Sequence, residues 1–319
     1  MDPPSRRRLG TDKQPITENA RAVLDRLELH RAGQMPAQSW WQYRLVQDDY
    51  ETVLHALDGD ECLRGYVEDK VRLDYDPYRS YMTIRLPTSL HDIFRVKVVS
   101  EILTQLSNFQ SSDKAFADFA RKVDHRSTTR IRLPDDTRAG EQPRSERNPD
   151  ASFKHDDAKY PGVIIEVCCS GKARAAADLA EDYILDTNGS VTTVIALNIE
   201  HECSKQATIS IWRPGYVTVD GIEEIRAVAA VDALAFRTAS GHPIEEPGQE
   251  PMFRLSLGDF APPLISREPT DIDQYISMSS RQLCDFLSHA ETSHQREVLG
   301  EGISQPPGMK KRRRPRTPS

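Results

Sequence analysis

Two almost continuous apolar runs, separated by one amphipathic segment, constrain the fold of this chain most strongly. The runs are GVIIEV at 162–167 and VTTVIALNI at 191–199, and the segment from Ala176 to Tyr183 places its apolar residues on one helical face. Strands that are apolar on both faces are typical of the centre of a covered sheet. A strand, a helix and a second strand in this order join parallel neighbours. The pattern therefore predicts a βαβ unit at the centre of the fold.

The flanking segments predict an α/β (α+β) fold in which helices flank a mixed central sheet. Residues 71–75 and 82–86 alternate between apolar and polar and form a hairpin pattern. A long amphipathic helix is expected to follow from Ser89, and DASFK at 150–154 is expected to pair with GVIIEV. Residues 134–149 carry no apolar periodicity and are predicted to be a loop.

Length and composition suggest one decorated domain with unstructured ends. The chain has 319 residues, of which 38% are hydrophobic and 29% charged. We expect residues 1–15 and 292–319 to be disordered and residues 16–291 to form a single domain with a core at about 71–212. No apolar run approaches the roughly 20 residues that a membrane-spanning helix needs, and no apolar stretch follows the basic N-terminus. A membrane or secreted protein is therefore not expected.

The charge is concentrated at the C-terminus. The whole chain carries −7, whereas its last eleven residues hold six Lys and Arg and no acid, so the remainder is more acidic still. An acidic body disfavours a large nucleic-acid surface but allows a small metal-bridged site. The run Lys310–Arg316 resembles a nuclear import signal, and a nonspecific polyanion-binding or solubilising tail is the alternative. We expect a nuclear protein, or one shared between nucleus and cytoplasm, that meets an import receptor through this run.

Two carboxylates stand at informative places. Asp150 opens the strand DASFK, and Glu166 lies inside the apolar run GVIIEV. A buried charge is costly unless it is paired or binds a cation. Two acids at the ends of adjacent strands can converge on Mg²⁺, which prefers a few carboxylates together with water and phosphate. Pairing of Glu166 with Arg132 or Lys154 is the alternative.

These residues carry a resemblance to a known superfamily. Pro149-Asp150, then Glu166, in the predicted order of helix, strands, helix and strand resembles the PD-(D/E)XK nucleases, which have the restriction-endonuclease-like fold. The segments RLPTSLHDIF, NPDASFKHDDAKYPGVIIEV and DLAEDYIL are similar to those of fungal proteins that carry such a domain. The resemblance covers about residues 71–212. It implies a nuclease that cleaves DNA with Mg²⁺, or with Mn²⁺, held by Asp150, Glu166 and the carbonyl of Val167.

The superfamily motif has a lysine two residues after the glutamate, and this chain has Cys168 there. In the superfamily that lysine orients and deprotonates the attacking water, which a cysteine cannot do. Two lysines are candidates for this function: Lys172, favoured for its reach over the strand end, and Lys154 on the neighbouring strand. The resemblance also suggests an acid on the preceding helix.

For that helical acid the leading candidate is Glu101, with Asp92 and His91 as alternatives. The missing lysine keeps a second function open, in which the chain is a catalytically degenerate relative that uses the fold for binding or assembly. Retained Asp150 and Glu166 favour the metal-dependent nuclease. Cys168 and the acidic body favour the binding module.

Overall fold

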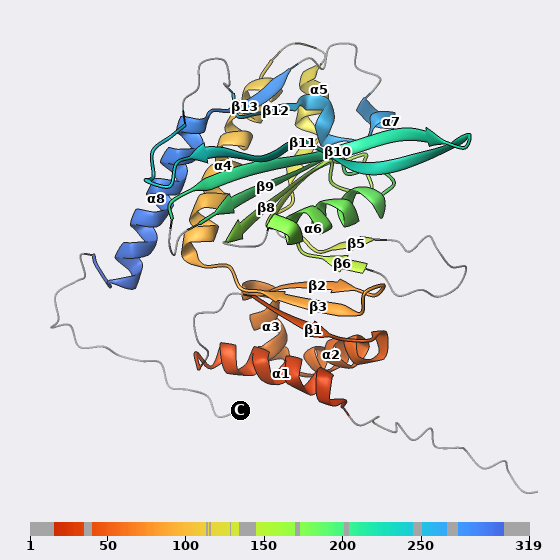
Figure 1. Ribbon diagram of the computed structural model, residues 1–319, viewed down its shortest axis with the longest axis vertical. Coiled ribbons are helices and arrows are strands. Elements are labelled where there is room, and N and C mark those ends of the chain that lie inside the picture. The colour runs from red at the N-terminus through yellow and green to blue at the C-terminus, as the bar shows by residue number, and fades with distance from the viewer. Residues whose placement is uncertain are drawn as a thin grey trace, which may run out of the picture.

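The structure is a computed structural model that describes residues 16–34, 40–112, 114, 116–127, 129–133, 145–169, 173–200, 204–244, 251–266 and 274–302. It has an α+β fold built on two sheets that lie one above the other, with helices outside and between them (Figure 1). The prediction of an α+β fold with a mixed central sheet is confirmed. In the described part of the chain, no helix combines the length and apolar character needed to cross a bilayer.

The N-terminal sheet is antiparallel throughout. Its strands are, in spatial order, β1 (Trp40–Arg44), β3 (Tyr81–Arg85), β2 (Arg72–Asp76), β6 (Ser145–Arg147) and β5 (Ile131–Leu133). Three helices cover one face and form a core with it: α1 (Glu18–Arg31), α2 (Gln47–Gly59) and α3 (Glu61–Lys70). Because side chains alternate along a strand, the polar residues of β2 and β3 point to the opposite face, toward the second sheet.

The second, central sheet has six strands and is mixed. Its order is β11 (Ile222–Arg237), β10 (Ala207–Val219), β9 (Thr193–Ile199), β8 (Val163–Cys169), β7 (Ala151–His155) and β4 (Val123–His125). β8 and β9 are parallel and every other pair is antiparallel. The predicted parallel unit is therefore confirmed, and its helix is α6 (Ala173–Leu185).

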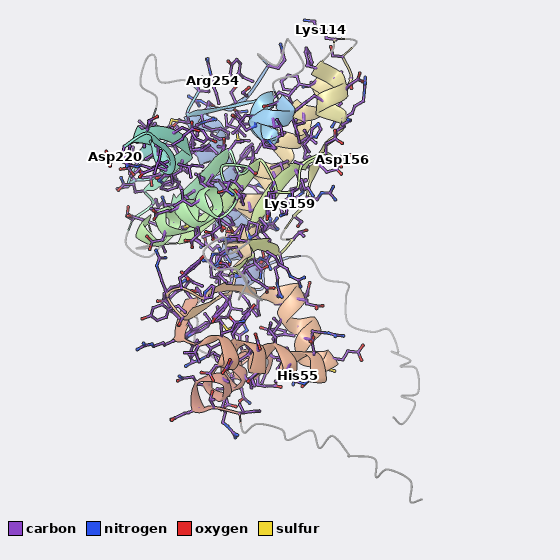
Figure 2. All side chains as sticks on the ribbon, turned by 90° about the vertical axis from the view of Figure 1, so that its right-hand side faces the viewer. His55, Lys114, Asp156, Lys159, Asp220 and Arg254 are labelled. Carbon is purple, nitrogen blue, oxygen red and sulfur yellow. The ribbon has the colours of Figure 1, made fainter. Side chains whose placement is uncertain are left out.

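Helices cover both faces of the central sheet. α4 (Ser89–Gln110) and α8 (Ser280–Val298) pack on one face, where the largest apolar core lies. α6 packs on the other face and so lies between the two sheets (Figure 1). Asn188 and Gly189, both at positive φ, lie in the turn that follows α6. Figure 2 shows the same layers from the side, with His55 in the N-terminal helical layer and Lys114 at the other end.

Smaller elements complete the central half of the molecule. They are α5 (Phe116–Arg121), β12 (Phe253–Ser256), a 3₁₀ turn (Leu257–Phe260), α7 (Pro263–Ser266) and β13 (Tyr275–Met278). β12 and β13 form a separate two-stranded sheet.

Strand β6 corrects the prediction of a continuous loop over 134–149. Ser145, Glu146 and Arg147 form this strand, and all three are buried although none is apolar. Glu146 accepts hydrogen bonds from Tyr50, Arg130 and Arg132, which compensates for its burial. A strand held by polar contacts has no apolar alternation, so a hydrophobicity pattern cannot find it. Residues 134–144 lie outside the described part of the chain.

Candidate functional site

Asp150 and Glu166 face each other across two adjacent strands. In the antiparallel pair of β7 and β8, Ala151 lies opposite Ile165. Asp150, just before Ala151, therefore lies opposite Glu166, just after Ile165. Directly opposed residues project to the same side of a sheet. Both carboxylates are buried, with 1% of each residue exposed. Both approach a single atom, Arg85 Nη1, which lies 2.8 Å from Glu166 Oε2 and 3.8 Å from Asp150 Oδ2.

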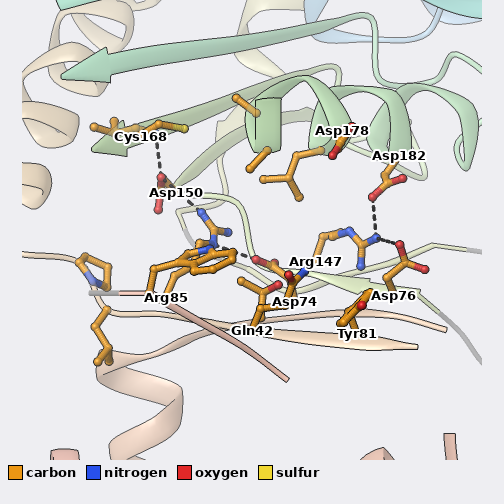
Figure 3. Close-up of a pocket in the computed structure, with 18 of the residues that line it drawn as sticks. Gln42, Asp74, Asp76, Tyr81, Arg85, Arg147, Asp150, Cys168, Asp178 and Asp182 are labelled. Carbon is orange, nitrogen blue, oxygen red and sulfur yellow. Dashed lines mark hydrogen bonds and ion pairs between the residues drawn. The ribbon is translucent and has the colours of Figure 1, made fainter. Parts of the chain in front are cut away.

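Arg85 comes from the N-terminal sheet, at the end of β3, and its guanidinium connects the two sheets. Its Nε donates a hydrogen bond to Asp74 Oδ2 at 2.8 Å, and its Nη2 donates to the carbonyl of Asn148 at 2.6 Å. All three guanidinium nitrogens therefore have partners. Figure 3 shows Arg85 between Asp74 below and Asp150 above. The three carboxylates Asp74, Asp150 and Glu166 share this one arginine.

Asp150 is held by two further donors. His91 Nε2 lies 3.0 Å from Asp150 Oδ2, and the amide of Val167 donates to the same oxygen at 2.8 Å. The position of His91 follows from the start of α4, because the side chain of Thr88 caps the helix by accepting from the His91 amide. All of these contacts fall on one carboxylate oxygen, Oδ2, which His91 and the Val167 amide hold in place.

The ionisation of this pair follows from these contacts. Burial raises the pKa of Asp150, but His91 and Arg85 outweigh burial and hold that pKa well below its usual range. Burial lowers the pKa of His91, but Asp150 outweighs it and raises the pKa of His91 to about 9. His91 is therefore an imidazolium at neutral pH, and the structure contains a buried ion pair between helix α4 and strand β7.

The pKa of Glu166 shifts in the opposite direction to that of Asp150. Burial raises the pKa of Glu166, Arg85 opposes the rise and Asp150 adds to it, which leaves the pKa at about 8. The hydroxyl of Tyr183 on α6 donates to Glu166 Oε1 at 2.9 Å. Three acids meet two cations here, so a proton on Glu166 balances the charge. We define the Arg85 cluster as Asp74, Arg85, His91, Asp150 and Glu166.

The Arg85 cluster does not fit a magnesium ion as it is arranged. Arg85 Nη1 occupies the space between the two carboxylates that a bridging cation would use. Four donors, from Arg85, His91, Val167 and Tyr183, already engage both oxygens of Glu166 and Oδ2 of Asp150. Among the described residues, no three His, Cys, Asp or Glu side chains form a group that could hold a metal ion. Mg²⁺ requires near-octahedral oxygen ligation, which this packing does not provide.

The other residues predicted for the site lie elsewhere. Lys154 is four residues after Asp150 on β7, about 13 Å along the strand. Glu101 is ten residues after His91 on α4, about 15 Å along the helix, and accepts a hydrogen bond from Gln105. Lys172 falls outside the described residues. Of the three helical candidates His91 reaches Asp150, and Asp92 lies 3.7 Å from the other ring nitrogen of His91.

Sequence reasoning missed Arg85 as the partner of the carboxylates. Glu166 pairs with Arg85, whereas Arg132, one expected alternative, contacts Glu146 instead. The only sequence signal for Arg85 is its place in the alternation of β3, which sets it on the face opposite the buried Met82 and Ile84. That alternation gives the face but not the partner, which lies 81 residues further along the chain.

A pocket of about 160 Å³ adjoins the Arg85 cluster, between the N-terminal sheet and α6. One wall carries Trp40 and Tyr81, and the other carries Ala176 and Leu179 of α6. Cys168, the residue at the position of the motif lysine, lines the same pocket. Its charged residues include Asp76, Arg79, Arg147, Asp178 and Asp182, and Arg147 Nη2 donates to Asp182 at 2.6 Å (Figure 3). No protein-family model and no curated protein matches this chain.

Proposed function

We propose that this chain is a catalytically silent member of the PD-(D/E)XK superfamily that functions by binding rather than by hydrolysis. The observation that carries the proposal is the position of Arg85, whose guanidinium holds both motif carboxylates at once. The motif lysine is replaced by Cys168, which cannot supply a positive charge. Arg85 supplies that charge from another sheet, where it binds the carboxylates instead of a water.

The energetics of the Arg85 cluster support a structural role. Removing one partner of a buried ion pair typically costs about 3–5 kcal/mol, because a buried charge is left uncompensated. A metal ion that displaced Arg85 would also separate it from Asp74 and from the carbonyl of Asn148. The cluster therefore favours the arginine-bound arrangement and opposes exchange for a divalent ion.

The pocket beside the cluster provides the place for a ligand. Aromatic Trp40 and Tyr81 face the apolar side chains of α6 across it, and charged residues border these walls. Concave sites with apolar walls and a few polar groups are typical of ligand-binding pockets. We infer that the bound ligand has an apolar body that enters between β1, β3 and α6.

The test is the response to divalent ions. We expect millimolar Mg²⁺ or Mn²⁺ to leave the melting temperature of the wild type unchanged, because a ligand stabilises a protein only if it binds the folded state. We also expect no cleavage of single- or double-stranded DNA with either ion. Thermal denaturation and a gel-based nuclease assay check both expectations. The matched variant is Glu166→Ala, which removes one of the two buried carboxylates of the motif.

A Mg²⁺-dependent nuclease acting on DNA is the second candidate function. The observation that favours it is the register that sets Asp150 opposite Glu166 on adjacent strands. For this function, Lys172 or Lys154 would provide the missing positive charge. Metal-dependent cleavage by the wild type that Glu166→Ala abolishes would establish the nuclease and exclude the binding module. Loss of that cleavage in Lys172→Ala, but not in Lys154→Ala, would assign the displaced lysine.

We infer a nuclear location from the basic run Lys310–Arg316, which lies outside the described residues. Deleting residues 310–319 from a fluorescent fusion of the full chain is expected to move the protein from the nucleus to the cytoplasm. The supporting physical feature is six positive charges without an acid in the last eleven residues. Fluorescence microscopy measures the ratio of nuclear to cytoplasmic signal. An unchanged ratio after the deletion contradicts the import signal and leaves a solubilising tail.

A further inference from the structure

Arg72 is a buried arginine that has no carboxylate partner among the residues that the structure describes. It opens β2 and is only 7% exposed. Its Nε makes no hydrogen bond, and none of the ion pairs formed by the described residues includes it. A largely buried guanidinium without a close counterion is costly, since no ion pair offsets its lost hydration. A fold that retains such a group has a reason to bind an anion there.

The nearest acids are already engaged by other cations. Asp150 and Asp92 act on Arg72 through their charge, and both favour its charged form. Asp150, however, accepts from His91 and lies 3.8 Å from Arg85 Nη1, and Asp92 is in contact with Arg95. Burial and the two nearby arginines, Arg85 and Arg95, lower the pKa of Arg72 below its usual range. The surroundings of Arg72 are therefore short of negative charge.

Arg72 lines a second pocket, of about 330 Å³, where β2 begins after α3. The other lining residues are Val67, Glu68, Val71, Arg130 and Asn148. Arg130 contributes a second guanidinium, which also donates to Glu146. The one acid among the lining residues, Glu68, is exposed, so solvent screens its charge. The pocket exceeds the space that a few water molecules need.

We propose that Arg72 and Arg130 form a binding site for a phosphate group, supplied by inorganic phosphate or by a small phosphate monoester. Guanidinium groups match the oxygens of phosphate through paired N–H donors. The pocket shares no lining residue with the pocket lined by Cys168, although Asp150 and Arg85 of the Arg85 cluster act on Arg72 through their charge. The proposal therefore stands or falls independently of the binding function proposed above.

The test compares the wild type with Arg72→Met in inorganic phosphate and in chloride of equal ionic strength. Saturating phosphate is expected to raise the melting temperature of the wild type by about 3 °C, as binding to the folded state requires. In Arg72→Met the rise is expected to vanish. Without phosphate, Arg72→Met is expected to be at least as stable as the wild type, because methionine removes an unpaired buried charge.

The control is Arg64→Met, which removes an arginine of α3 that is 41% exposed and pairs with Asp58. This variant should keep the full response to phosphate. An equal rise in the wild type and Arg72→Met would show general salting-out and overturn the site. No rise in the wild type, or a large loss of stability in phosphate-free Arg72→Met, would overturn it as well.

Calorimetric titration distinguishes the two sources of the phosphate group. Inorganic phosphate and glycerol phosphate are each titrated into the wild type and into Arg72→Lys, which keeps the charge but loses the fork of donors. Tighter binding of glycerol phosphate identifies an ester ligand, and equal or weaker binding identifies the free ion. In either case, the affinity for the ligand is expected to fall at least tenfold in Arg72→Lys. Unchanged affinity in that variant would overturn the role of the guanidinium.

Discussion

Arg85→Met is expected to lower the free energy of unfolding by about 3–5 kcal/mol, the cost of leaving buried charges without a partner. The arginine is 16% exposed and contacts Asp74, Asp150 and Glu166, of which the last two are fully buried. Its loss leaves three acids with His91 as the remaining cation of the Arg85 cluster. Denaturation by urea, followed by circular dichroism, measures the effect.

A matched control for this variant is Arg79→Met. Arg79 lines the neighbouring pocket, but its side chain is 52% exposed and its contact with Asp76 is 3.5 Å long. Exposed ion pairs contribute little, so we expect a change below about 1 kcal/mol. Adding Asp74→Asn to Arg85→Met removes one of the uncompensated charges and is expected to recover part of the loss. If Arg85→Met is as mild as Arg79→Met, the arginine does not hold the carboxylates.

Raising the pH from 6.5 to 9 is expected to destabilise the wild type through His91. The folded pKa of about 9 lies above the unfolded value of 6.5, so the folded protein binds the additional proton in this window. The stabilisation is fully present below pH 6.5 and is lost as the pH passes 9. The shift corresponds to stabilisation on the order of 3 kcal/mol. Glu166 acts in the same direction, because its folded pKa of about 8 also lies above its ordinary value.

The His91→Gln variant isolates the contribution of the histidine. Its stability relative to the wild type should be lowest below pH 6.5, and the difference should shrink toward pH 9. Urea denaturation at several pH values gives this difference directly. The matched control is His55→Gln, which changes an exposed histidine of α2 and should follow the wild type at every pH. A difference between wild type and His91→Gln that does not vary with pH would contradict the ion pair with Asp150.

The centre of the central sheet could be predicted because its strands coincide with local runs of apolar residues. The runs that became β8 and β9, and the amphipathic residues of α6, contain enough information to fix a parallel pair. The approach of Asp150 to Glu166 follows from the register of the neighbouring antiparallel pair, β7 and β8. These features depend only on period and on neighbouring elements of the chain.

The partners of the two carboxylates could not be predicted in this way. Arg85 reaches Glu166 from a different sheet, and His91 reaches Asp150 because a helix cap sets its place. Neither contact can be inferred from the spacing of residues along the sequence. Glu101 has a carboxylate that suits a metal site, but it is His91, in the first turn of α4, that contacts Asp150. Contacts between sheets depend on the tertiary packing, which single-residue preferences do not encode.

The N-terminal sheet is not built from the N-terminal part of the chain alone. β5 and β6 join it after the chain has passed through α4, α5 and β4, which belong with the central sheet. A fragment that ends before α4 would therefore lack two of the five strands and expose the edge of β2. The N-terminal sheet cannot complete its hydrogen bonding until the chain has passed through elements of the central layer, so we expect the two sheets to unfold in one cooperative transition rather than as separable units.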